Sequence, residues 1–288
     1  MTTIKDALEH AACTLAQADQ PPPRLDVQVL LAHVLGVDRA ILYAYPERLL
    51  TPQQEEQFHQ LLARRKQGEP VAYLVGHKEF FGLDFLVDNR VLIPRPETEL
   101  LVEAALKSIR ALLDVGHTPL VADIGTGSGV IPITLAVQEP RLPYLYATDI
   151  SGEALEVARI NCRRHSVEKR VRLLYGDLFS PLPEPIEVLT ANLPYVGTRE
   201  MDLLVPDVHA YEPHMALFSG VDGLDLLLRF FTEAQRSGKL KEHAQLLLEI
   251  GYQQREPLER LLSKLWPRAA VTFVKDYSGW DRLLVVVL

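Results

Sequence analysis

The second half of the chain alternates short apolar runs with helical stretches, and this alternation limits the possible folds more than any other feature. Seven runs have the length and composition of strands: 120–124, 144–150, 171–175, 186–191, 245–250, 270–275 and 283–288. Helical patterns separate most of them, at about 128–137, 152–165, 224–237 and 253–265. Such alternation predicts an α/β domain with a mostly parallel sheet. The last two runs are too close together for a crossover helix, so the final strand is predicted to be antiparallel.

The first 70 residues carry helical patterns and no strand pattern. Thr3 and Thr51 are followed three residues later by Asp6 and Gln54, a spacing typical of capping boxes. Helices are predicted at about 4–15, 25–35 and 52–67, with the prolines at 21–23 ending the first and a connection after the second. In residues 71–93, short apolar and aromatic pieces at 71–75, 79–81, 85–87 and 91–93 predict a β-hairpin that turns at Gly82. The expected division is therefore a helical domain (1–70), a hairpin linker (71–93) and an α/β domain (94–288).

Composition narrows the class of protein. The net charge is −8, from 38 acidic and 30 basic residues, which argues against a protein that wraps nucleic acid through phosphate contacts. Cys13 and Cys162 match no metal-binding spacing, and the nine histidines form no ligand pairs, so no metal site is predicted. No apolar run approaches about 18 residues and the amino terminus does not resemble a signal peptide. We expect a cytoplasmic protein with reduced cysteines and no membrane partner.

A glycine-rich loop follows the first strand of the α/β region, in the sequence Asp123-Ile124-Gly125-Thr126-Gly127-Ser128-Gly129. Glycines at alternate positions let the backbone turn tightly and admit a ligand where a Cβ atom would block it, just before a helix. Dinucleotide-dependent enzymes and methyltransferases share this pattern, so the loop alone leaves both classes open.

The next two strands also end in aspartates. Asp149 can accept hydrogen bonds from both hydroxyls of a ribose, although it can also cap the helix beside Ser151. Asp177 can accept from an adenine amino group while Leu178 or Phe179 packs against the ring. This order favours S-adenosylmethionine over NAD, because nothing in the pattern requires room for a diphosphate. The predicted cofactor site comprises Asp123, Gly125, Thr126, Gly127, Ser128, Gly129, Asp149, Asp177, Leu178, Phe179 and Asn192.

The strand at 186–191 leads into Asn192-Leu193-Pro194-Tyr195, the predicted catalytic group. The Asn192 side-chain carbonyl and the Leu193 main-chain carbonyl can each accept one hydrogen of a planar NH2 group. Pro194 fixes its own φ and keeps Leu193 extended, so both acceptors are set before the substrate arrives. Tyr195 offers a flat face for stacking. The same tetrapeptide also suits an ordinary turn at a strand end, so the prediction depends on its α/β context.

Several stretches together resemble the HemK/PrmC family of protein N5-glutamine methyltransferases. The similarity covers nearly the whole chain, in Glu69-Pro70-Val71-Ala72-Tyr73-Leu74 with Gly76 and Glu79-Phe80, Ile93 to Glu99, Asp123 to Gly129, Asn192 to Tyr195, Tyr211-Glu212-Pro213 with Ala216-Leu217, Asp222-Gly223-Leu224-Asp225, Glu249-Ile250-Gly251, and Asp276 with Asp281-Arg282. The resemblance implies a seven-stranded Rossmann-like methyltransferase domain that uses S-adenosylmethionine, preceded by a small all-α domain and a hairpin. It also implies that Asn192 to Tyr195 hold the glutamine of the Gly-Gly-Gln motif in class 1 peptide chain release factors.

Two departures from the family pattern are visible. The family usually has Asn-Pro-Pro-Tyr where this chain has Leu193, and Asn-Leu-Pro-Tyr is also similar to rRNA adenine dimethyltransferases. The family usually has two glycines where this chain has Phe218-Ser219-Gly220, which concerns only local loop shape. An N6-adenine methyltransferase acting on RNA or DNA is therefore the alternative, and a non-catalytic binding module or an NAD oxidoreductase is a third possibility. The leading expectation is glutamine methylation, with the helical domain gripping the release factor and no direct nucleic-acid binding.

Overall fold

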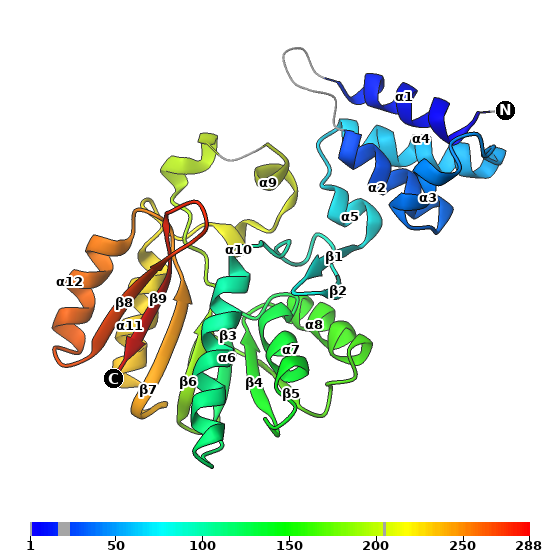
Figure 1. Ribbon diagram of the computed structural model, residues 1–288. Coiled ribbons are helices and arrows are strands. Elements are labelled where there is room, and N and C mark those ends of the chain that lie inside the picture. The colour runs from blue at the N-terminus through cyan, green and yellow to red at the C-terminus, as the bar shows by residue number, and fades with distance from the viewer. Residues whose placement is uncertain (1, 17–23, 204–205) are drawn as a thin grey trace. The chain divides into compact units, whose positions relative to one another are not determined.

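The computed structural model describes residues 2–16, 24–203 and 206–288 (Figure 1). The chain divides into two compact units, Met1–His77 with Val205–Tyr211, and Lys78–Leu204 with Glu212–Leu288. The first unit thus runs past the boundary expected at residue 70 and includes a segment from the middle of the expected α/β domain. No helix in the described ranges has the length and apolar character needed to cross a bilayer.

Helices make up the first unit: α1 Ile4–Leu15, α2 Arg24–Leu35, α3 Arg39–Ala44, α4 Pro52–Lys66, α5 Val71–Val75 and α9 Pro206–Tyr211. Both predicted capping boxes are present, at Thr3 and Thr51. Two predictions were wrong: α3 lies in the expected connection, and α5 replaces the strand expected at 71–75. The β-branched sequence of α5 still forms one helical turn because Tyr73, Leu74 and Val75 become buried there. The prolines expected to end α1 lie outside the described residues.

Residues from α1, α2 and α4 form the core of the first unit, with Ile4, Leu30, Leu31 and Phe58 at most 2% exposed. Within the same unit, residues of α9 bind to the C-terminal end of α4. Arg65 contacts Asp26 at 2.8 Å and Asp207 at 2.6 Å, and the Tyr211 hydroxyl donates to the Gln67 carbonyl at 3.0 Å.

The predicted hairpin is present as β1 His77–Phe80 and β2 Leu83–Leu86, which pair with each other. Phe81 and Gly82 have φ of 53° and 73° in the turn, the sign that two-residue hairpin loops favour. Phe80 and Phe85 are buried in the core of the second unit, which explains why an exposed loop would not suit these residues. The strand expected at 91–93 is absent, and this segment is irregular.

The second unit contains one seven-stranded sheet in the order β5-β4-β3-β6-β7-β9-β8 (Figure 1). The strands are β3 Val121–Ile124, β4 Leu145–Asp149, β5 Val171–Tyr175, β6 Ile186–Ala191, β7 Leu240–Glu249, β8 Ala270–Lys275 and β9 Asp281–Val287. Strands β3 to β7 pair in parallel, while β9 runs antiparallel to both β7 and β8. All seven predicted strands and the predicted antiparallel final strand are thus confirmed.

Helices pack on both faces of the sheet: α6 Thr98–Asp114, α7 Val130–Gln138, α8 Gly152–Arg164, α11 Asp225–Arg236 and α12 Arg255–Leu265, with shorter elements η1 Thr198–Leu203 and α10 His214–Leu217. Side chains alternate along each strand, so Val121 faces the core shared with α6 and α7, and Ala122 faces the core shared with α11 and α12. This arrangement confirms the Rossmann-like fold. Because β3 has β4 on one side and β6 on the other, a ligand crevice is expected beyond the carboxyl ends of these strands.

Candidate functional site

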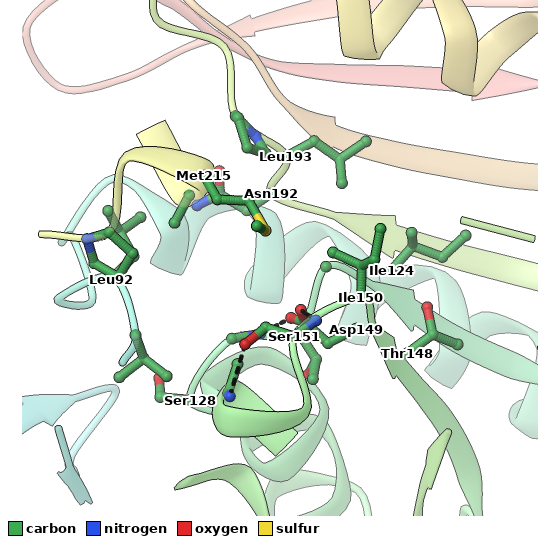
Figure 2. A pocket seen from close by; sticks show the side chains of 18 of the residues that line it. Leu92, Ile124, Ser128, Thr148, Asp149, Ile150, Ser151, Asn192, Leu193 and Met215 are labelled. Carbon is green, nitrogen blue, oxygen red and sulfur yellow. Dashed lines mark hydrogen bonds between the residues drawn. The ribbon is translucent and has the colours of Figure 1, made fainter. Parts of the chain in front are cut away.

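A cavity of about 670 Å³ lies at the carboxyl ends of β3, β4 and β6, entirely within the second unit. Its size falls in the range of small-molecule sites. Figure 2 shows Asn192 and Met215 across the cavity from Asp149 and Ser151. The site therefore occupies the crevice that the strand order predicts.

The glycine loop forms one wall. Gly125 has φ of +74°, and a Cβ atom there would come within 2.9 Å of Leu193 Cδ2, so a side chain at this position would collide with the segment predicted to be catalytic. Gly127 has φ of +55° and nothing within 4 Å of its missing Cβ atom. Because Gly127 lines the cavity, its absent side chain leaves room for a ligand to approach the backbone.

Asp149 closes the loop at the end of β4. Its Oδ2 accepts a hydrogen bond from the Gly127 N–H at 2.8 Å, and its Oδ1 accepts from the Ser151 N–H at 2.9 Å. Burial raises the pKa of Asp149, and the bonds from these backbone groups oppose that rise. Each oxygen keeps a further lone pair for a ligand. The alternative role of Asp149, as a helix cap, is filled by its neighbour: the N-cap of α8 is Ser151, whose Oγ accepts from the Ala154 N–H at 3.1 Å.

The remaining predicted cofactor residues divide into two groups. Thr126, Ser128, Asp177 and Leu178 line the cavity, and Asp177 is paired with Arg229 from α11. Asp123, Gly129 and Phe179 are absent from the lining and serve the structure around it. The residues of this second group were predicted from their positions in the sequence motifs. Such positions do not distinguish a side chain that lies beneath the loop from one that faces the cavity.

Each of these three residues has a structural role. Asp123 is fully buried and accepts from the Thr190 hydroxyl at 2.7 Å, and burial raises its pKa to about 7. Gly129 begins α7, where a Cβ atom would lie 3.2 Å from Ala158 Cβ. Phe179 packs on Phe230 with ring centroids 5.0 Å apart.

Three members of the predicted catalytic group, Asn192, Leu193 and Pro194, line the cavity. The Asn192 Nδ2 group donates to Glu249 Oε2 at 3.0 Å and to Thr98 Oγ1 at 3.2 Å. Both bonds occupy the nitrogen branch of the amide, so Oδ1 is left as an acceptor and has no partner among the described residues. The Leu193 carbonyl likewise receives no hydrogen bond from any part of the chain that the structure describes.

Tyr195 is placed differently from the prediction. Its ring packs against the core shared with α11 and α12, outside the cavity lining, and its hydroxyl donates to Glu249 Oε1 at 2.8 Å. Burial raises the pKa of Tyr195 well above its ordinary value. Tyr195 is therefore the member of the predicted catalytic group that does not line the cavity.

Sequence reasoning assigned no role to four residues of the site. Glu249 ends β7 and is 2% exposed, and Thr98 begins α6 beside it. Ile150 lines the cavity directly after Asp149 and is 50% exposed. Arg95 lines the cavity and pairs at 2.5 Å with buried Glu212 of the Tyr-Glu-Pro stretch. Two signals in the sequence could have identified some of these residues. Glu249 is a carboxylate at the end of an apolar strand, and Ile150 is an apolar residue directly after Asp149, the predicted ribose acceptor.

Two family models match the chain. The PrmC N-terminal domain matches residues 6–76, and the methyltransferase small domain matches residues 98–207. Solved structures with under 25% identity share the fold. The hMettl16 catalytic domain in complex with MAT2A 3'UTR hairpin 6 has a TM-score of 0.56, 17% identity, and coverage of 78% of this chain and 81% of that one. A methyltransferase from Pyrococcus furiosus has a TM-score of 0.51, 20% identity, and coverage of 78% and 96%.

Full-length relatives are much more similar. Release factor glutamine methyltransferase from Koribacter versatilis is 41% identical over 286 residues, covering 98% of both chains. The proteins of the same name from Moorella thermoacetica and Coxiella burnetii are 40% and 36% identical, covering 97% and 99% of this chain and 96% and 99% of the relatives. The chain therefore belongs to the release factor glutamine methyltransferase family.

Proposed function

We propose that this enzyme transfers a methyl group from S-adenosylmethionine to the side-chain amide nitrogen (N5) of the glutamine in the Gly-Gly-Gln motif of class 1 release factors. The observation that carries the proposal is the orientation of Asn192. Its amide nitrogen is held by Glu249 and Thr98, so that Oδ1 remains as a fixed acceptor in a cavity beside a glycine-rich loop. The relatives named for this activity, which match the whole chain, support the same conclusion.

The residues present fit S-adenosylmethionine. The open space at Gly127 suits close approach of the cofactor to the loop backbone, and Asp149 has acceptor capacity for ribose hydroxyls. Ile150 and Leu178 supply apolar surface for an adenine ring, with Asp177 at its edge. When bound, this cofactor supplies an electrophilic methyl group on a sulfonium.

The chain's own residues orient the nitrogen that accepts the methyl group. An amide nitrogen is a poor nucleophile because its lone pair is delocalised into the carbonyl. Asn192 Oδ1 and the Leu193 carbonyl can accept its two hydrogens, which fixes the NH2 group and places negative potential where positive charge develops. Such positioning can contribute on the order of 7 kcal/mol. Methyl transfer precedes loss of the surplus proton, so the site needs no general base.

Mass spectrometry tests the proposal directly. The enzyme is incubated with S-adenosylmethionine and a class 1 release factor, and the factor is digested and sequenced. We expect one added CH2 group on the Gly-Gly-Gln glutamine, and none when that glutamine is replaced by alanine. Asn192→Ala should reduce kcat at least about 100-fold. A release factor that stays unmodified, or label that enters RNA adenines instead, would contradict the proposal.

The helical unit is expected to contribute to binding of the protein substrate. Tyr43 and Tyr45 at α3 are 65% and 60% exposed and offer apolar surface for such contact. Replacing both with serine in the full chain should raise KM for the release factor and leave cofactor affinity unchanged. We infer a cytoplasmic site of action, since release factors work on ribosomes.

A further inference from the structure

Glu249 lies behind the proposed catalytic asparagine and collects three hydrogen bonds. Its Oε2 accepts from the Thr98 hydroxyl at 2.6 Å and from Asn192 Nδ2 at 3.0 Å, while its Oε1 accepts from the Tyr195 hydroxyl at 2.8 Å. The side chain is buried and is absent from the cavity lining. Glu249 therefore acts on the cavity only through its neighbours.

The pattern of donors determines which way the Asn192 amide turns. An asparagine amide has a donor branch and an acceptor branch of nearly the same shape, and its surroundings choose between the two orientations. The Thr98 hydroxyl donates its one hydrogen to Glu249, so the Thr98 oxygen can only act as an acceptor toward Asn192. An ionised Glu249 can also only accept. Both neighbours of Asn192 on this side thus require its NH2 group, and the carbonyl must occupy the other side.

The surroundings of Glu249 act on its pKa in both directions. Burial raises the pKa of Glu249, and Glu97 acts in the same direction, whereas the Thr98 and Tyr195 hydroxyls and the positive charge of Arg282 oppose the rise. Arg282 also opposes the rise in the pKa of Tyr195 that burial causes, so this cation acts on Tyr195 as well as on Glu249. A neutral amide at position 249 is therefore expected to keep its oxygen toward Tyr195 and Arg282 and to turn its NH2 group toward Asn192.

We propose that Glu249 is a positioning residue that fixes the Asn192 carbonyl toward the substrate and thereby selects an NH2 group as the methyl acceptor. The proposal rests on the proposed function, because it assumes that Asn192 Oδ1 accepts from the glutamine amide. Without the carboxylate, Asn192 can reverse and present its own NH2 group to the substrate. Two NH2 groups would then face each other, and the substrate nitrogen would lose one acceptor.

The test compares Glu249→Gln and Glu249→Met with the wild type in full-length protein. Both variants should lower kcat/KM for a release factor about 100- to 1,000-fold, the usual effect of removing one oriented polar group from a reacting centre. The dissociation constant for S-adenosylmethionine, measured by calorimetry, should stay within about threefold of the wild-type value. Glu256→Gln is the matched control, since it removes the same charge from an exposed side chain on α12 and should leave kcat/KM unchanged.

A reciprocal exchange distinguishes positioning from general structural support. Asn192→Asp alone places two carboxylates against each other and should be nearly inactive. In Asn192→Asp combined with Glu249→Gln, the new carboxylate accepts from the amide introduced at position 249 and still presents an oxygen to the cavity. This double variant should recover at least about tenfold in kcat/KM over Glu249→Gln, a coupling that distant sites do not show.

Each outcome has a defined meaning. If the wild type methylates the release factor and Glu249→Gln and Glu249→Met do so at wild-type rates, the positioning role is wrong. If activity falls without recovery in the double variant, or together with cofactor binding or the thermal transition, Glu249 supports the fold and the inference also fails. If the wild type itself leaves the release factor unmodified, the proposed function fails instead.

Discussion

Replacing Asn161 with leucine should weaken the hairpin and the cofactor loop together. Asn161 lies in α8 and is fully buried. Its Oδ1 accepts from the Leu86 N–H at 2.8 Å, and its Nδ2 donates to the Leu86 carbonyl at 3.0 Å and to the Ser128 carbonyl at 2.9 Å. One side chain thus satisfies strand β2 of the hairpin and a residue that lines the cavity.

The three bonds set the magnitude of the effect. Leucine has a similar shape but leaves the Leu86 N–H, the Leu86 carbonyl and the Ser128 carbonyl without their partner. Each unpaired buried group costs about 1 to 3 kcal/mol. Taking the low end for each, because Leu86 is only partly buried, we expect a loss of about 3 kcal/mol in the free energy of unfolding. For a unit of this size, that loss lowers the melting temperature by about 6 to 12 °C.

Thermal unfolding and hydrogen exchange test this prediction. Asn161→Leu should melt earlier, exchange the Leu86 amide faster, and bind S-adenosylmethionine about tenfold more weakly, because the loop around Ser128 loses an anchor. The control is Ile160→Leu, a change of shape at the neighbouring, partly exposed position of the same helix. An unchanged melting temperature with normal protection of Leu86 would show that the Asn161 bonds contribute little.

Three other changes have defined expectations. Burial raises the pKa of Asp123 to about 7. The stability that this group contributes is therefore full below its unfolded pKa near 4 and is lost as the pH rises through 7. In urea unfolding, Asp123→Asn should be more stable than the wild type by about 1 to 4 kcal/mol at pH 8, and no more stable at pH 4. Asp149→Ala removes the anchor of the glycine loop and the proposed ribose acceptor, and calorimetry should show S-adenosylmethionine binding weakened about 100-fold, with equal affinity refuting the assignment. Arg65→Met leaves Asp26 and Asp207 half-buried and unpaired, which should cost about 3 kcal/mol; exchange of residues 206–211 should quicken, and unchanged exchange would contradict the anchoring role.

Much of the second unit follows from sequence because its central strands are buried on both faces. Runs such as 186–191 are mostly apolar, and their lengths and spacing leave few alternatives to a parallel sheet. The first unit was harder to predict. Residues 71–75 have a strand-like composition, and their helical state depends on burial against other helices of that unit, which local patterns do not encode.

The site divides along a similar line. The glycine loop, Asp149 and Asn192 were predictable because each requirement is local: a bare backbone, or an acceptor at a strand end. The contact between Asn192 and Glu249 joins residues 57 positions apart through two neighbouring strands, so only the sheet order reveals it. The placement of Tyr195 could not be predicted for the same reason, since its hydroxyl partner is Glu249 and the sequence motif contains no sign of that partner.

The use of asparagine rather than aspartate at the reacting centre follows from this buried carboxylate. Two carboxylates in hydrogen-bond contact are not both readily ionised, so an aspartate at position 192 would make the pair depend on taking up a proton. An asparagine gives one directional acceptor without adding charge, as long as hydrogen bonds from its neighbours fix the orientation of its side-chain amide. In the proposed arrangement Glu249 fixes that orientation from outside the cavity lining, and an ionised Glu249 acts on the cavity through a neutral amide. The charge therefore adds negative potential near the substrate nitrogen without offering that nitrogen a competing base.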